Sequence, residues 1–94
     1  MLKLYILVYS NSIKQETLIE LFNKNSNIEF WFISLPQSIF FKTTLTATEI
    51  NSWMVQHFGN AAQFTTEISA SNYNGMLPEN HIKYFNSRTS RTVI

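Results

Sequence analysis

The connection between two apolar segments in the middle of the chain is the strongest constraint on its fold. Residues 28–35 and 38–43 are rich in aromatic and aliphatic side chains, and only Pro36 and Gln37 separate them. So short a connection joins antiparallel neighbours, because a parallel pair needs a crossover of a dozen or more residues. Proline has no amide hydrogen to give to a ladder, so it belongs in the turn or at a strand end. The sequence therefore predicts a β-hairpin over residues 28–43.

A helix pattern precedes this hairpin. Ser12 and Gln15 have the spacing of a capping box, in which the serine hydroxyl accepts a backbone N–H and the glutamine side chain returns the bond. The following residues place an apolar stripe on one side of a helix, formed by Leu18, Leu21 and Phe22. We expect a first helix from Ser12 to the polar run at residues 23–27.

A second helix pattern follows the hairpin. Thr46 and Glu49 form a capping box, and Leu45 is placed to pack against the first full turn. One face of the predicted helix is apolar or aromatic and is formed by Ile50, Trp53, Met54, His57 and Phe58. Gly59 comes directly after this face and suits a helix end.

Two further strand patterns complete the sheet. Residues 2–9 are mostly aliphatic or aromatic, and residues 63–70 alternate apolar with polar side chains. Pro78 stands where proline is favoured, at the start of a short terminal helix. The order of elements predicts an α+β, ferredoxin-like βαββαβ fold: a four-stranded antiparallel sheet with two helices on one face plus a short C-terminal helix. We expect one domain over residues 1–86 and a polar, mildly basic tail over residues 87–94.

The first predicted strand is apolar on both of its faces. Alternate residues Leu4, Ile6 and Val8 share one face, and we expect this face to lie under the helices. An exposed apolar sheet face usually marks an interface, so the opposite face predicts a homodimer, joined sheet against sheet or edge against edge. The residues expected at this interface are Tyr5, Leu7, Tyr9 and Trp31.

The charge pattern places the candidate contacts for a nucleic-acid partner at two points of the chain. Charged residues make up 14% of the chain and the net charge is +1, so no strong field attracts phosphates. An aromatic sheet face can also stack unpaired bases, although the central strands lack the Lys/Arg-Gly-aromatic pattern of RNA-recognition modules. The candidate anion or nucleic-acid contacts are three residues before the first helix and two in the tail: Ser10, Asn11, Ser12, Arg88 and Arg91.

The residue types present exclude several kinds of chemistry. The chain has no cysteine, which excludes disulfides and thiolate metal sites, and no aspartate, which leaves six glutamates as its only acidic side chains. Metal-dependent nucleases need clustered carboxylates, and Gly59 and Gly75 alone cannot form a phosphate-binding loop. We expect His57 at a helix end or in the core and His81 at the surface. No catalytic residue, metal or cofactor is predicted.

No segment of the sequence predicts membrane insertion. The longest apolar run covers residues 4–9, far short of the ~20 residues that a membrane-spanning helix needs. The same run lacks the cleavage site of a secretory signal. We expect a cytoplasmic protein.

Two segments resemble a known family. Residues 31–49 resemble the middle of the SinR-like proteins, small relatives of the CRISPR-associated second adaptation protein and of the VapD ribonucleases. Residues 72–78, Asn-Tyr-Asn-Gly-Met-Leu-Pro, resemble that group's Gly-aromatic-Leu-Pro signature. The resemblance covers most of residues 2–86 and implies a ferredoxin-like fold and a homodimer built through the sheet.

The same resemblance separates this chain from the family's enzymes. Its better-known members are metal-dependent nucleases or nucleic-acid-binding structural subunits, and the nucleases carry an aspartate directly after the tyrosine of the first strand. Here that position is Ser10, and Met76 stands where the family has tryptophan. We therefore predict a small, non-catalytic, homodimeric binding or scaffold protein. Two alternatives are a metal-dependent endonuclease with a non-standard site and a toxin–antitoxin or phage-defence component that acts through protein contact.

Overall fold

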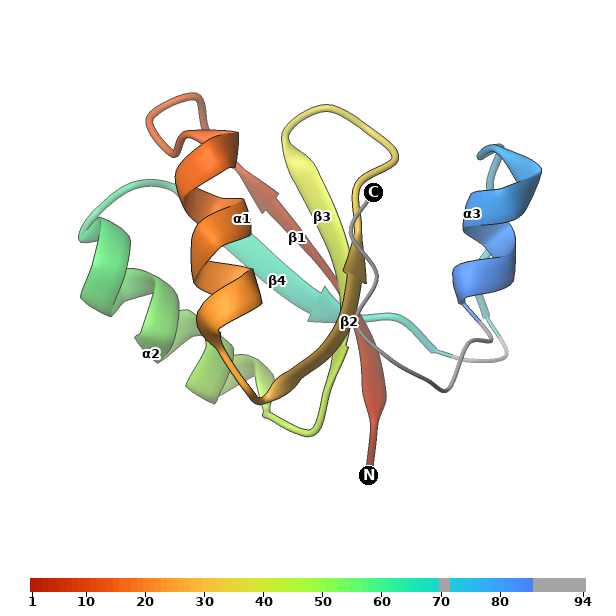
Figure 1. Cartoon of the computed structure of the whole chain (residues 1–94), viewed down its shortest axis with the longest axis horizontal. Coiled ribbons are helices and arrows are strands. Elements are labelled where there is room, and N and C mark those ends of the chain that lie inside the picture. Colours follow the sequence, from red (N-terminus) through yellow and green to blue (C-terminus); the bar gives the residue numbers. More distant parts are fainter. Residues whose placement is uncertain (70–71, 86–94) are drawn as a thin grey trace.

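The computed structural model describes residues 1–69 and 72–85; the predictions on Arg88, Arg91 and the rest of the tail lie outside these ranges. A four-stranded sheet forms the centre of the molecule, with helices on both of its sides (Figure 1). The elements in chain order are β1 (Lys3–Tyr9), α1 (Gln15–Lys24), β2 (Ile28–Phe32), β3 (Ser38–Thr43), α2 (Ala47–Phe58), β4 (Gln63–Glu67) and α3 (Glu79–Tyr84).

The sheet has the strand order β2-β3-β1-β4, and every neighbouring pair is antiparallel. The predicted hairpin is the β2–β3 pair, although β2 ends at Phe32 rather than at residue 35. The α+β class and the four-stranded antiparallel sheet are therefore confirmed. The strand order is compatible with a ferredoxin-like fold.

The two predicted helix starts have different outcomes. At α2 the capping box is present, with Glu49 N donating to Thr46 Oγ1 at 3.1 Å and Thr46 N donating to Glu49 Oε1 at 2.8 Å. At α1 the prediction is wrong, because the helix begins at Gln15 and has no side-chain cap. The hydroxyl of Ser12 lies 2.7 Å from the hydroxyl of Ser10 instead.

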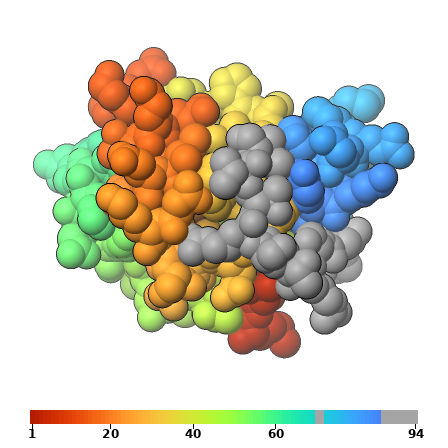
Figure 2. Space-filling model, viewed as in Figure 1, coloured from red at the N-terminus to blue at the C-terminus, as the bar shows by residue number. Residues whose placement is uncertain are grey.

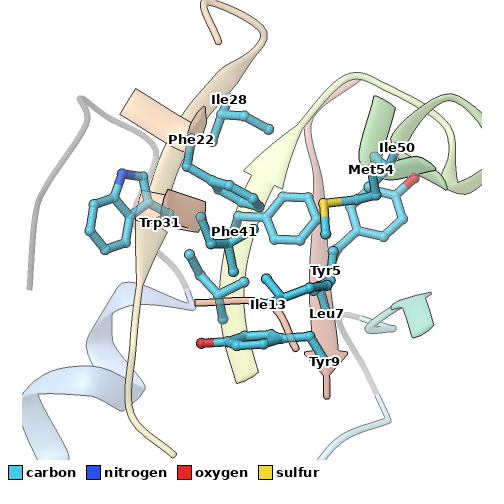
Figure 3. Close-up of a cluster of buried hydrophobic side chains, with 12 residues drawn as sticks. Tyr5, Leu7, Tyr9, Ile13, Phe22, Ile28, Trp31, Phe41, Ile50 and Met54 are labelled. Atoms are coloured by element: carbon cyan, nitrogen blue, oxygen red, sulfur yellow. The ribbon is translucent and has the colours of Figure 1, made fainter. Parts of the chain in front are cut away.

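The helices α1 and α2 cover one face of the sheet and enclose the main core (Figure 1). Side chains from three strands and both helices converge there (Figure 3). The ring of Phe22 meets the ring of Phe41 edge-on at 5.0 Å. Two polar groups in this core have partners, since Tyr5 Oη donates to Leu45 O at 2.8 Å and Trp31 Nε1 donates to Asn23 Oδ1 at 2.9 Å.

The predicted orientation of β1 is wrong. Four residues were expected on an uncovered sheet face, but all of them are buried in the core beneath α1 and α2: Tyr5, Leu7, Tyr9 and Trp31. None of their side chains is more than 5% exposed. These four side chains therefore cannot form a dimer surface in this fold. Both faces of β1 are apolar, so its period-2 pattern separates the two sets of side chains but does not say which set meets the helices.

The opposite face, here called the second sheet face, is also partly covered. Phe30, Phe32 and Phe40 form a second buried cluster on it, and α3 packs against this cluster. Residues 72–85, drawn in blue, lie on the opposite side of the molecule from the green atoms of α2 (Figure 2). The expectation of a bare face is therefore wrong for the half built from β2 and β3.

None of the helices in the described ranges is long and apolar enough to cross a bilayer.

Candidate binding site on the second sheet face

Aromatic rings hold α3 on the second sheet face. The ring of Phe32 lies 5.2 Å from that of Tyr84 and 5.7 Å from that of Phe85. Phe40 stacks on Phe32 at 5.0 Å and lies 5.3 Å from Phe85. Centroid distances in this range are typical of favourable aromatic pairs. These contacts fix one wall of the candidate site, although α3 has only six residues.

His81 adds a polar contact to this packing. Its Nδ1 lies 2.9 Å from Ser34 Oγ, and its ring lies 5.7 Å from the ring of Phe32. His81 was predicted at the surface, and the structure places its imidazole only partly exposed, between α3 and the chain that follows β2. His57 was expected either at a helix end or in the core. It is exposed and lies in the last turn of α2, which agrees with the first alternative.

A cavity of about 500 Å³ lies between the sheet and the segment that leads into α3. Its floor is formed by Ile6, Phe40 and Ile68, and its walls come mainly from residues 73–77 and α3. The lining residues are Ile6, Leu35, Phe40, Ile68, Tyr73, Asn74, Gly75, Met76, Leu77, Ile82 and Phe85. None of these side chains carries a charge. A cavity of this size with an apolar lining matches the usual form of a ligand site.

Exposed apolar side chains surround this cavity. Leu35 is 45% exposed at its rim, and Met76 is 95% exposed. Beyond it, Phe64 of β4 is 65% exposed and pairs across the strands with Val8 of β1. The half of the second sheet face built from β1 and β4 thus keeps apolar side chains in contact with solvent, which is costly unless something covers them.

The predicted anion contacts Ser10, Asn11 and Ser12 lie in the turn between β1 and α1. Ser10 and Ser12 bond each other, and the main chain turns back there because Ile13 N donates to Ser10 O at 3.1 Å. The helix N-terminus that should have attracted an anion begins only at Gln15. A second cavity, of about 480 Å³, includes Ser10 but neither Asn11 nor Ser12, and all its lining side chains are uncharged.

The titratable groups of the core are held in their neutral form. Burial raises the pKa of the Tyr9 phenol above its ordinary value of 10.0. Burial also raises the pKa of Tyr5, and the negative charges of Glu67 and Glu49 raise it further. Both phenols are therefore protonated at neutral pH.

Within residues 1–69 and 72–85, no three His, Cys, Asp or Glu side chains are grouped closely enough to hold a metal ion.

The sequence contained part of the signal for this site. The alternation of Phe64, Thr66 and Ile68 was visible, but it became informative only once the orientation of β1 was known. Leu35 was predicted as the end of a strand, and Met76 as part of a family signature, but neither pattern placed them at a cavity, because both lie outside the regular elements of the structure. No family model, curated protein or solved structure matches this chain.

Proposed function

We propose that this protein is a small, non-catalytic, homodimeric binding protein that holds an uncharged apolar group in the cavity beside α3. The observation that carries the proposal is the lining of that cavity, in which the described side chains are mainly apolar and none is charged. A charged ligand would lose its hydration there and find no countercharge among the lining residues of the described ranges, whereas an apolar ligand would bury its surface at no such cost. The exposed Leu35 and Met76 give the ligand an apolar entrance.

The absence of catalysis in this proposal is supported by the groups at the end of β1. Ser10 stands there, and the neighbouring cavity is lined by neutral side chains such as Gln37 and Gln63. We also propose the ferredoxin-like arrangement as the finer description of the fold, supported by the strand order. The relationship to SinR-like proteins is proposed on residues 31–49 and 72–78 alone. Contact with nucleic acid through Arg88 and Arg91 stays a prediction.

Binding of an uncharged hydrophobic fluorophore, N-phenyl-1-naphthylamine, tests the cavity. The wild-type protein should bind the dye saturably, with a rise in its fluorescence and a shift to shorter wavelength. Leu35→Glu places a carboxylate at the rim and should weaken the affinity about tenfold, because the ligand would then desolvate a charge. Val55→Glu is the matched control, since Val55 is 47% exposed but lies on α2, across the sheet from the cavity.

Two results would contradict the proposed site. One is the failure of the folded wild-type protein to take up the dye saturably. The other is an equal loss of affinity in Leu35→Glu and Val55→Glu, because such a loss would reflect added charge rather than the cavity.

A further inference from the structure

The strand β4 is an edge of the sheet without the features that usually keep an edge from pairing. Its five residues match β1 without a register shift, and they include neither lysine nor proline. The other edge strand, β2, has an irregularity in its pairing between Ile28 and Phe30, which is a common protection. Within the described ranges β4 is paired on one side only.

Two hydrogen bonds show which main-chain groups of β4 point outward. Ile68 N donates to Leu4 O at 2.8 Å, and Ser10 N donates to Ala62 O at 3.0 Å. The even-numbered residues of β4 and of the positions directly beside it therefore direct their N–H and C=O groups toward β1. Neighbouring residues of a strand direct these groups to opposite sides. The outward groups therefore belong to Gln63, Thr65 and Glu67.

The geometry points to a second copy of this chain as the partner of β4, paired antiparallel about a two-fold axis through Thr65. This inference rests on the homodimer of the proposed function and specifies how that dimer is built. Thr65 pairs with Thr65 of the second copy, and Gln63 pairs with Glu67 of the second copy, twice by symmetry. Each of these pairs exchanges two main-chain hydrogen bonds, because their N–H and C=O groups face each other. The two sheets then become one continuous sheet.

The charges of β4 are compatible with this register and disfavour an axis at Glu67. With the axis at Thr65, each Glu67 carboxylate lies opposite the neutral amide of Gln63. The amide nitrogen of Gln63 uses one N–H for Asn51 Oδ1 at 2.7 Å, and its second N–H can serve the carboxylate. An axis at Glu67 would instead place two carboxylates directly opposite each other, which is unfavourable. The axis at Thr65 also overlaps all five residues of the strand.

Two side chains of β4 gain contacts in this arrangement. The hydroxyl oxygen of Thr65 is buried and has no hydrogen-bond partner among the residues that the structure describes. Opposite Thr65 of the second copy, rotation about χ1 gives each hydroxyl a partner. On the second sheet face, the two Phe64 rings become diagonal neighbours, which aromatic side chains can bridge. The most exposed aromatic ring of the described strands is thereby covered.

Sedimentation equilibrium of the full chain over a concentration series tests this pairing. The wild type should sediment with twice the 11.0 kDa mass of the chain. Gln63→Glu places a carboxylate opposite Glu67 in two symmetric pairs and should weaken dimerisation about tenfold. The double variant Gln63→Glu/Glu67→Gln exchanges the two partners and should restore the wild-type dissociation constant. Gln15→Glu adds the same charge on α1 and should change nothing.

A cysteine placed on the axis gives an independent measurement. The chain has no cysteine of its own, so Thr65→Cys should be cross-linked between copies by a short bis-maleimide, and Thr17→Cys on α1 should not. The β4 pairing would be overturned if Gln63→Glu dimerises as tightly as Gln15→Glu and Thr65→Cys is cross-linked no more than Thr17→Cys. The proposed homodimer would still stand in that case. A wild type that stays monomeric would overturn both, whereas the dye measurement would still decide the cavity.

Discussion

The two phenol groups of the main core have different surroundings. Tyr5 Oη donates to Leu45 O at 2.8 Å, where the chain turns from β3 toward α2. Tyr9 Oη is buried without a hydrogen-bond partner in the part of the chain that the structure describes. A buried polar group with a partner stabilises the fold modestly, and one without a partner opposes folding by its lost hydration. The same hydroxyl group therefore has opposite effects at these two positions.

Replacing each tyrosine by phenylalanine tests this difference. Tyr5→Phe should lower the free energy of unfolding by about 1 kcal/mol, because it leaves the carbonyl of Leu45 without its donor. Tyr9→Phe should leave the free energy of unfolding unchanged or raise it by up to about 1 kcal/mol. Urea denaturation followed by circular dichroism gives both values. An equal loss in the two variants would show that Tyr9 has a partner of its own.

Among the elements, the start of α2 was predictable from the sequence and the start of α1 was not. The two bonds of the Thr46–Glu49 capping box involve only groups within one turn of helix, so the local spacing was sufficient. Ser12 had the same spacing to Gln15, but a competing hydroxyl two residues earlier, that of Ser10, bonds it instead. A capping pattern therefore predicts a helix start only where no nearby polar side chain competes for the hydrogen bond of the capping hydroxyl.

Alanine substitutions at the two predicted caps should separate them. Thr46→Ala should lower the free energy of unfolding by about 1 kcal/mol, the usual cost of losing a side-chain cap. Ser12→Ala should change it by less than about 0.5 kcal/mol, because the exposed Ser10–Ser12 contact caps no helix. Thermal or urea denaturation of the two variants beside the wild type provides the comparison. A Ser12→Ala variant as unstable as Thr46→Ala would mean that Ser12 does cap α1.

At the scale of the whole molecule, the orientation of the sheet decides where a partner can bind. The sequence predicted the strands, the hairpin and the helices, because these depend on local pattern and on short connections. It could not predict that Tyr5 and Trp31 lie under α1 and α2, since either apolar face of β1 could have met the helices. Which face of β1 meets the helices depends on how the side chains of α1, α2 and the strands pack together in the main core. The cavity beside α3 and the exposed Phe64 follow from it.

Hydroxyl-radical footprinting, read by mass spectrometry of the peptides, tests this orientation most directly. The account predicts fast oxidation of Met76 and of Phe64 in dilute protein, with slower oxidation of Phe64 at concentrations that favour the dimer. It also predicts that Tyr5 and Trp31, at most 1% exposed, are protected at every concentration. Fast oxidation of Tyr5 and Trp31, with Phe64 protected even in dilute protein, would contradict it.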